Sequence, residues 1–224
     1  MDGILNLYKP AGITSMTAVT RVKRALKLGK AGHAGTLDPA ATGVLLVCIG
    51  KATKLFDALQ AHDKEYVGTV RLGIETDTYD AAGRQLQSRA VPPLTAADLD
   101  AALDAFRGEI RQVPPMYSAL KRDGRPLYKL AREGQTVERE ARTVTVRELE
   151  LLQTDLPRLR LRVLCTRGTY IRSLAHDLGV ALGCGAHLES LERTRSGPYR
   201  SADALPLEEL EAHPELALER IVLP

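Results

Sequence analysis

The chain has 224 residues, of which 44% are hydrophobic and 26% charged, proportions typical of a globular protein with a sizeable core. Every apolar run is far shorter than the ~20 residues that span a bilayer, and the first residues lack the basic and apolar stretches of a signal peptide. Cys48, Cys165 and Cys184 have neither a zinc-site spacing nor that of a disulfide framework. These features exclude a membrane protein and a disulfide-stapled secreted domain, and they predict a cytoplasmic protein without a metal centre.

The net charge of +3 is unevenly spread along the chain. Residues 201–224 have a balance of −5, so residues 1–200 hold +8. Basic clusters occur within residues 21–30, 121–132 and 193–200. Each cluster taken singly is typical of a solvated face, but a cationic surface of this total size also suits a phosphate backbone. The pattern is therefore consistent with a nucleic-acid partner without requiring one.

Hydrophobic periodicity and turn residues predict alternating strands and helices. The expected strands cover residues 3–10, 44–49, 66–72, 143–152, 158–166 and 186–194. The expected helices cover residues 15–29, 51–59, 95–106, 126–133 and 169–178, with one amphipathic helix from Pro206 onward. Thr14 or Ser15 can cap the first helix, and Thr95 with Asp98 forms a capping box for the third.

Residues 33–43 place one carboxylate, Asp38, among small residues. Glycines there permit unusual dihedrals and the close approach of another molecule, and Pro39 pushes Asp38 toward an extended conformation. The apolar run at residues 44–49 has the length and β-branching of a buried strand. The pattern is consistent with an acid held at the end of that strand, although on these residues alone a plain Asp-Pro turn is the favoured explanation.

Residues 75–83 contain three carboxylates, at Glu75, Asp77 and Asp80. They lack both the register and the closing glutamate of a calcium-binding loop. We therefore predict a polar turn and no metal site there.

Residues 32–45, Gly-His-Ala-Gly-Thr-Leu-Asp-Pro-Ala-Ala-Thr-Gly-Val-Leu, resemble the active-site motif of bacterial tRNA pseudouridine synthases of the TruB type. These enzymes convert the uridine at tRNA position 55 to pseudouridine. Further blocks match in the family's order, at residues 9–15, 64–66, 73–83, 114–121, 124–134, 168–174 and 185–194. Collinear blocks over so much of the chain make the resemblance specific.

The resemblance implies an α/β pseudouridine synthase fold, with a mixed, largely antiparallel sheet flanked by helices and a catalytic cleft at the Asp38 loop. We expect a single catalytic domain over residues 1–224, in which residues 75–134 form an insertion-like lobe. Bacterial members usually continue into a small RNA-binding PUA domain. This chain stops at Pro224, about where that domain would begin, so no C-terminal PUA domain is expected within it.

Three catalytic residues are implied by the resemblance. Asp38 matches the family's essential aspartate, and Arg172 resembles the arginine that pairs with it and keeps a carboxylate ionised and aimed. Tyr170 resembles an active-site tyrosine whose phenol helps with proton movement at C5 of the base. From the residues alone, a core tyrosine and a solvated or phosphate-binding arginine remain open alternatives.

Five substrate-binding residues are implied in the same way. Tyr66 resembles the family's base-stacking tyrosine, His33 the histidine that contacts the T-loop, and Leu191 a residue that lines the uracil pocket. Lys9 and Lys64 are expected to contact RNA or to hold the active-site loops.

The implied reaction breaks the N1–C1′ bond of uridine and forms a C5–C1′ bond, so we expect no cofactor and no metal. A carboxylate can attack C1′ or C6, stabilise a cation or remove a proton, and the sequence does not choose among these. The expected partner of a monomeric enzyme is the T-arm stem-loop of tRNA, whose uridine has to be flipped out at a cost of a few kcal/mol. The alternative is a non-catalytic tRNA-binding or folding protein on the same scaffold.

Overall fold

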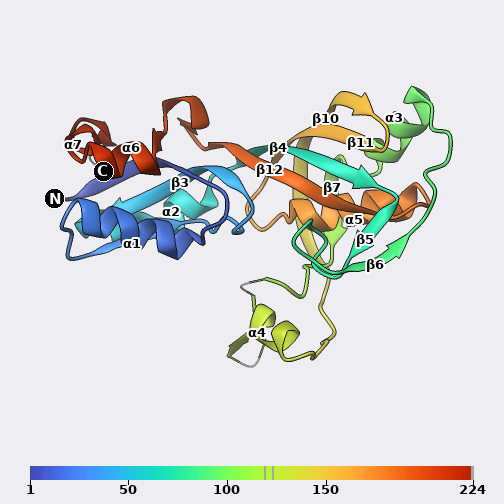
Figure 1. The fold of residues 1–224 in the computed structure, drawn as a ribbon, viewed down its shortest axis with the longest axis horizontal. Helices are drawn as coiled ribbons and strands as arrows, with labels where there is room; N and C mark the ends of the chain where they lie inside the picture. Colours follow the sequence, from blue (N-terminus) through green and yellow to red (C-terminus); the bar gives the residue numbers. More distant parts are fainter. Residues whose placement is uncertain (119, 123, 223–224) are drawn as a thin grey trace. The chain divides into compact units, whose positions relative to one another are not determined.

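The computed structural model describes residues 1–118, 120–122 and 124–222 (Figure 1). It contains two compact units. Unit 1 consists of residues 1–67 together with the segment from Leu191 onward, and unit 2 consists of residues 68–190. Unit 1 is thus assembled from both ends of the chain, and unit 2 from its middle.

Strand β3 (Thr42–Ile49) is the centre of the sheet in unit 1. It pairs antiparallel with β1 (Gly3–Lys9) and with β2 (Ala31–Ala34), and parallel with β12 (Ala186–Ser196) through Arg193 opposite Gly43. Short strands complete this sheet, namely β13 (Tyr199–Arg200), β14 (Leu205–Pro206) and β15 (Ile221–Val222). All residues from 44 to 49 are buried, as expected for a strand covered on both faces.

Helices cover the sheet of unit 1 and contribute to its two apolar clusters. They are α1 (Ser15–Ala25), the 3₁₀ helix at Gly50–Leu55, α2 (Phe56–Ala61), the 3₁₀ turn at Ser201–Asp203, α6 (Leu207–Ala212) and α7 (Glu215–Arg220). Figure 1 shows the N-terminal β1 and the C-terminal α6 next to each other. Thr14 caps α1 as predicted, because its side chain accepts the Thr17 N–H.

The expectation of one helix from Pro206 onward is wrong, because α6 and α7 are separate. The break falls at Pro214, which has no N–H to donate to a continuing helix. The helix expected at residues 51–59 instead begins as a 3₁₀ helix. Helix α1 ends before Gly29, because Lys27 takes a positive φ of 52°. The final residues, 223 and 224, lie outside the described part.

Unit 2 contains strands in the order β4 (Lys64–Leu72, of which residues 68–72 belong to this unit), β11 (Arg158–Cys165), β10 (Arg142–Asp155) and β7 (Gly108–Gln112). Strand β10 pairs antiparallel with both β11 and β7. Leu159, Leu161 and Val163 are buried, which confirms the predicted alternation of apolar and basic residues along β11. Two small hairpins, β5 (Ile74–Thr76) with β6 (Gln85–Ser88) and β8 (Lys121–Arg122) with β9 (Arg125–Pro126), complete the strands.

The helices of unit 2 are α3 (Ala96–Asp104), α4 (Leu127–Arg132) and α5 (Ile171–Ala181) over the described residues. The capping box of Thr95 and Asp98 is present at the start of α3, as predicted. Helix α4 carries its own small apolar cluster, with Leu127 and Leu130 buried against Met116. Ala119, within the predicted motif block at residues 114–121, and Asp123, between that block and the next, lie outside the described residues. The mixed α/β fold with largely antiparallel pairing is therefore confirmed, and none of the described helices is long and apolar enough to span a bilayer.

Candidate active site

The loop that carries Asp38 joins β2 to β3 in unit 1 and is held at both neighbours of the aspartate. The Leu37 N–H donates to Ser15 Oγ over 2.8 Å, and this hydroxyl donates back to the Leu37 carbonyl over 3.0 Å. The Pro39 carbonyl accepts the Gly12 N–H over 2.8 Å, and the Asp38 carbonyl accepts the Ala41 N–H over 3.1 Å. These bonds fix the backbone from which the carboxylate projects.

A fully buried lysine supports the same loop. Lys9 Nζ donates to the carbonyl oxygens of Pro10 (2.6 Å), Ile13 (2.9 Å) and Pro39 (3.3 Å). Burial lowers the pKa of Lys9 from 10.5 to about 8; the negative charge of Asp38 opposes this shift, and the positive charge of Arg193 adds to it. Lys9 was expected either to contact RNA or to hold the active-site loops. Its bonds to backbone carbonyls correspond to the second role.

A buried arginine that sequence reasoning did not single out binds the start of the loop. Arg193 donates from Nε to the Val44 carbonyl over 2.7 Å, and from its two terminal nitrogens to Gly35 (3.1 Å) and Thr36 (3.4 Å). Its backbone packs so closely on β3 that a Cβ at Gly43 would lie 2.3 Å from the Arg193 carbonyl oxygen. In the sequence it stands in a matched block and in the basic cluster at residues 193–200, and neither signal predicted a buried arginine.

His33 lies on β2, a strand that the sequence did not predict, opposite Val47. Its Nδ1 is buried and has no hydrogen-bond partner among the described residues. Burial and the charge of Arg193 lower the pKa of His33, so the ring is neutral at pH 7. Unit 1 therefore presents a neutral imidazole on the strand that leads into the Asp38 loop.

Tyr66 and Leu191 are half-buried and pack against the apolar cluster that contains Leu37 and Ala41. The Leu191 carbonyl accepts a 3.4 Å bond from Thr42 Oγ1. Unit 1 thus brings a tyrosine ring and a leucine to the cluster on which the Asp38 loop rests, and apolar walls of this kind suit a flat ring of a ligand.

Lys64 is buried at the start of β4, where its Nζ donates to the carbonyls of Gln60 and, over 2.6 Å, His62. These backbone bonds at the end of α2 again correspond to holding a segment of the chain.

In unit 2, Tyr170 is the N-cap residue of α5, and a buried glutamine fixes its backbone. The Tyr170 N–H donates to Gln112 Oε1 over 2.7 Å, while Gln112 Nε2 donates to the Tyr170 carbonyl over 3.0 Å. Ser173 Oγ also donates to the Val113 carbonyl over 2.9 Å. The side-chain amide of Gln112 therefore sets the position of the Tyr170 backbone, although no sequence motif singled out this glutamine.

Arg172 is buried, so a solvated side chain is excluded. Its terminal nitrogens donate to the carbonyls of Thr78 (3.2 Å) and Tyr117 (2.9 Å), and one lies 3.6 Å from Asp80 Oδ2. Asp80 in turn accepts bonds from Thr78 Oγ1 and the Ala82 N–H. The predicted polar turn is confirmed, and its carboxylate orients the arginine.

Unit 1 thus offers a carboxylate on a fixed loop, supported by a buried ammonium, with apolar walls nearby. Such a group can serve as a nucleophile or a proton acceptor toward a planar substrate. Unit 2 offers a fixed tyrosine and a buried guanidinium, which can move a proton and stabilise negative charge.

Two family descriptions match the chain. "TruB family pseudouridylate synthase (N terminal domain)" matches residues 23–171, and "tRNA pseudouridylate synthase B C-terminal domain" matches residues 172–224. A protein of Pseudomonas putida named tRNA pseudouridine synthase B is 53% identical over all of this chain and 74% of its own length. One of the same name from Opitutus terrae is 49% identical over all of this chain and 93% of its own length.

Two solved structures are similar as well. A chain of a Cbf5-Nop10-Gar1 complex is 36% identical with a TM-score of 0.76, covering 97% of this chain and 56% of that one. A chain of an H/ACA RNP bound to a substrate RNA containing 2′-deoxyuridine is 33% identical with a TM-score of 0.71, covering 97% and 55%. This chain spans only a little more than half the length of those two.

Proposed function

Because the chain belongs to the TruB family of pseudouridylate synthases, we propose that it converts the uridine at position 55 in the T-loop of tRNA to pseudouridine. The observation that carries this proposal is Asp38, which stands in the family's motif on a loop braced by the buried Lys9 and Arg193. Relatives named tRNA pseudouridine synthase B, about half identical over the whole chain, support tRNA as the substrate.

The reaction is an isomerisation, in which the N1–C1′ bond breaks, the base turns, and a C5–C1′ bond forms while C5 loses its proton. In this proposal Asp38 is the essential carboxylate, acting at C1′ or C6 of the nucleotide. Tyr170 assists the proton movement at C5. Arg172 supplies the positive charge that keeps the catalytic carboxylate ionised. No cofactor is needed, because no electron or phosphoryl group is transferred.

The substrate has to be flipped out of the folded T-arm before a carboxylate can reach its sugar. We assign base stacking to Tyr66, which offsets part of the flipping cost with about 1–3 kcal/mol. Leu191 lines the uracil site and His33 contacts the T-loop, while Lys9 and Lys64 hold the loops beside them. The chain acts as one catalytic domain, with residues 75–134 as a lobe, and works as a monomer in the cytoplasm.

The test is incubation of the purified protein with an unmodified tRNA transcript, followed by pseudouridine mapping. Wild type is expected to modify position 55, and Asp38→Asn is expected to bind tRNA without modifying it, because shape is kept and charge is lost. Asp77→Asn is the matched control, since Asp77 accepts the Arg84 N–H in a turn and its loss should leave turnover intact. Turnover by Asp38→Asn above background would overturn the assignment, and tRNA binding without modification by wild type would favour a non-catalytic tRNA-binding protein.

A further inference from the structure

The ring of Tyr79 stacks on the ring of His176 in unit 2, and neither residue has a part in the reaction proposed above. The ring centroids lie 4.0 Å apart, and the two planes are inclined by only 10°. Tyr79 belongs to the turn that joins β5 to β6 (residues 77–84), and His176 belongs to α5. Figure 1 shows the β5–β6 hairpin beside α5. Both residues are half-buried, so the stack joins two elements of the fold.

The stack lies directly next to Arg172. In α5, His176 follows Arg172 by four residues, so the two side chains leave the same face of the helix. In the turn, Tyr79 stands between Thr78 and Asp80. The Thr78 carbonyl accepts a bond from Arg172 Nη1 over 3.2 Å, and the Asp80 carboxylate lies 3.6 Å from this nitrogen. Arg172 thus contacts both chain neighbours of Tyr79, while His176 contacts Tyr79 itself.

Tyr79 adopts a backbone conformation that a bulky side chain rarely takes. Its φ is +63°, in the left-handed region that favours glycine, and such residues persist where the surrounding structure holds them. The Tyr79 N–H donates to the Thr76 carbonyl over 3.3 Å, and the Tyr79 carbonyl accepts the Leu188 N–H over 2.9 Å. The φ of Tyr79 sets the direction of Asp80 relative to Thr78. A relaxed φ would therefore displace one of the two groups that bind the guanidinium.

Several bonds of Asp80 fix the shape of the turn from within. Asp80 Oδ1 accepts bonds from Thr78 Oγ1 over 2.6 Å and from the Ala82 N–H over 3.1 Å. The Asp80 carbonyl accepts Thr76 Oγ1 over 2.7 Å. These partners all lie within residues 76–82, so their bonds do not join the turn to α5. The ring stack adds a contact between the turn and α5 that does not depend on the guanidinium charge.

His176 contributes to this contact through the face of its ring. Its Nδ1 is buried and has no hydrogen-bond partner among the described residues, although a buried polar atom normally has one. A near-parallel stack uses the flat π-surface of the ring, and an aromatic pair stabilises packing beyond the area that it buries. The shape of the ring, and not a hydrogen bond from this nitrogen, is therefore the property that the position requires.

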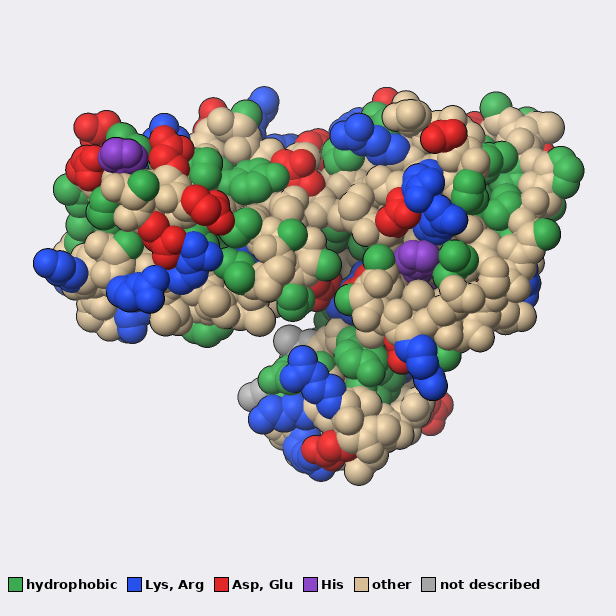
Figure 2. Space-filling view, viewed as in Figure 1, with side chains coloured by type: hydrophobic (Ala, Val, Ile, Leu, Met, Phe, Trp, Pro, Cys, Tyr) green, Lys and Arg blue, Asp and Glu red, His purple; other side chains and the backbone are tan. Residues whose placement is uncertain are grey.

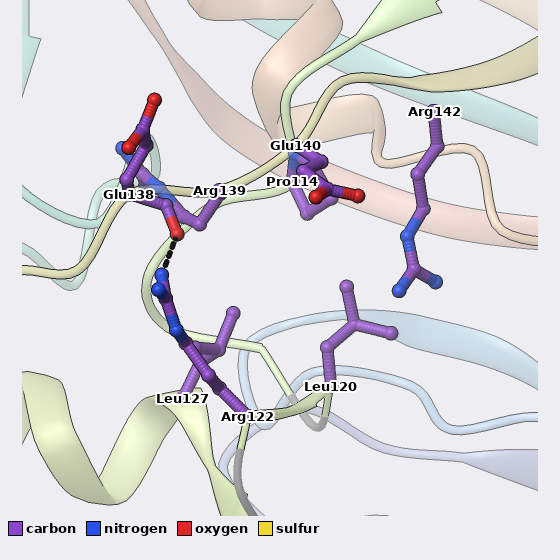
Figure 3. A pocket seen from close by; sticks show the side chains of 8 residues that line it. All are labelled: Pro114, Leu120, Arg122, Leu127, Glu138, Arg139, Glu140 and Arg142. Atoms are coloured by element: carbon purple, nitrogen blue, oxygen red, sulfur yellow. Dashed lines mark hydrogen bonds between the residues drawn. The ribbon is translucent and has the colours of Figure 1, made fainter.

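The stack is separate from the cavity of about 380 Å³ in unit 2, which is lined by residues of the chain before and after α4 (Figure 3). Arg122 donates from a terminal nitrogen to the Glu138 carbonyl at this cavity, and Lys and Arg side chains gather on the surface over α4 (Figure 2). Neither Tyr79 nor His176 lines the cavity. The stack therefore does not serve as one of its walls.

We infer that Tyr79 and His176 are positioning residues for the isomerisation. Their stack holds the β5–β6 turn against α5, so that Thr78 and Asp80 keep the Arg172 guanidinium in its working orientation. The two rings act through Arg172 and do not touch the nucleotide. The inference rests on the proposed function, because the stack serves the reaction only through this arginine.

The test measures kcat and KM with an unmodified tRNA transcript. His176→Leu keeps apolar bulk and loses the flat ring, so kcat should fall about five- to tenfold, an effect within the range of an aromatic pair. KM should change by less than about twofold, because the contacts to tRNA stay in place. Tyr79→Leu should act in the same way. His176→Phe and Tyr79→Phe keep a flat ring and should retain most of the wild-type kcat.

A double variant tests whether the two rings act as one unit. Tyr79→Leu combined with His176→Leu should lower kcat no further than either single change, because the same contact is lost in all three proteins. Losses that multiply in the double variant would mean that the rings act independently, which would contradict the inference.

Leu178→Val is the matched control for general destabilisation of α5. Leu178 is fully buried in the same helix and takes no part in the stack. Its shortening should lower the melting temperature and leave kcat unchanged at temperatures where the protein is folded. If the stack only stabilised the fold, His176→Leu would behave like Leu178→Val, and the inference would be wrong.

Hydrogen exchange of the turn gives a second readout that needs no turnover. The N–H groups of Tyr79 and Ala81 are hydrogen-bonded to backbone carbonyls. Both should exchange faster in His176→Leu than in wild type or in Leu178→Val, because the turn opens more often without the stack. Unchanged exchange would show that the stack does not hold the turn.

Wild-type kcat in a folded His176→Leu protein would overturn the inference, and so would a His176→Phe protein as slow as His176→Leu. Failure of the proposed function has a different signature. Wild type would then produce no pseudouridine, whereas hydrogen exchange of the turn would still respond to His176→Leu.

Discussion

Lys9 and Arg193 are two buried cations that bind the backbone around Asp38, and between them they bond to six carbonyl groups. A buried ammonium is costly unless it is hydrogen-bonded and near opposite charge. The lowered pKa of Lys9 reflects that cost, and Asp38 counteracts it. Loss of the Lys9 proton is therefore expected to change both the position of the Asp38 loop and the electrostatic potential at its carboxylate.

We predict that turnover falls as pH rises through about 8, because Lys9 then loses its proton. Stability has the opposite sign: between pH 8 and 10.5 the unfolded chain holds a proton that the folded chain has lost, so this group makes the free energy of unfolding rise with pH. Single-turnover rates and melting temperatures at pH 7.5 and 9 separate the two effects. Lys9→Met should be slower at pH 7.5 and should lack the step near pH 8; a step shared by this variant would contradict the assignment.

At the scale of elements, the end of β7 meets the start of α5. Gln112 closes β7 and bonds to both backbone groups of Tyr170, and Val113 accepts a bond from Ser173. The Tyr170 carbonyl also accepts the Leu174 N–H, so loss of Gln112 removes one of two bonds to this carbonyl and the bond that Gln112 accepts from the Tyr170 N–H.

Gln112→Met is expected to reduce kcat tenfold or more with little change in the KM for tRNA, because Tyr170 loses its fixed position. The free energy of unfolding should fall by about 1–3 kcal/mol, the usual effect of an unsatisfied buried group. Ser173→Ala is the matched control: it removes a buried hydrogen bond from the same turn of α5 and should destabilise the fold while largely sparing kcat. Gln112→Glu, which keeps an acceptor for the Tyr170 N–H, should recover part of the rate. Equal kcat losses in Gln112→Met and Ser173→Ala would mean that Gln112 has only a structural role.

Elements with local signals were predictable from the sequence, such as the Thr95 capping box and the alternating strand β11. The break between α6 and α7 also had a local signal in Pro214, which the amphipathic pattern obscured. Strand β2 and the roles of Gln112 and Arg193 were not predictable, because they depend on pairing between distant segments. Arg193 and Val44, for example, are 149 residues apart in the chain, and nothing near either residue records their contact.

At the scale of the whole molecule, the acidic C-terminal segment identified in the sequence packs against a basic helix. Glu211 in α6 lies against α1, where Arg21 donates to it over 2.8 Å and Arg24 lies 3.5 Å away. Hydrogen bonding to Arg21 lowers the pKa of Glu211. The acidic C-terminal segment thus neutralises part of the basic face of α1, and its other exposed glutamates repel a polyanion.

Replacing Glu208, Glu209 and Glu219 with glutamine should therefore strengthen tRNA binding several-fold at low salt, since three negative charges are removed while the Arg21–Glu211 pair stays intact. The effect acts over distance and is screened. It should vanish near 1 M salt, where the Debye length is ~3 Å. Titrations of tRNA at several salt concentrations test this; a gain that persists at high salt would indicate a changed contact in place of a long-range field.

The assembly of unit 1 from both ends of the chain has a consequence for its synthesis. Domains generally fold in order as they leave the ribosome, and the segment that builds unit 2 emerges before unit 1 is complete. The Asp38 loop leaves the ribosome early, yet Arg193 and β12, which hold this loop, and α6, which packs on α1, are made much later. A nascent chain therefore carries the Asp38 carboxylate on an incomplete unit 1, and we expect it to become competent for chemistry only after β12 and α6 have been made.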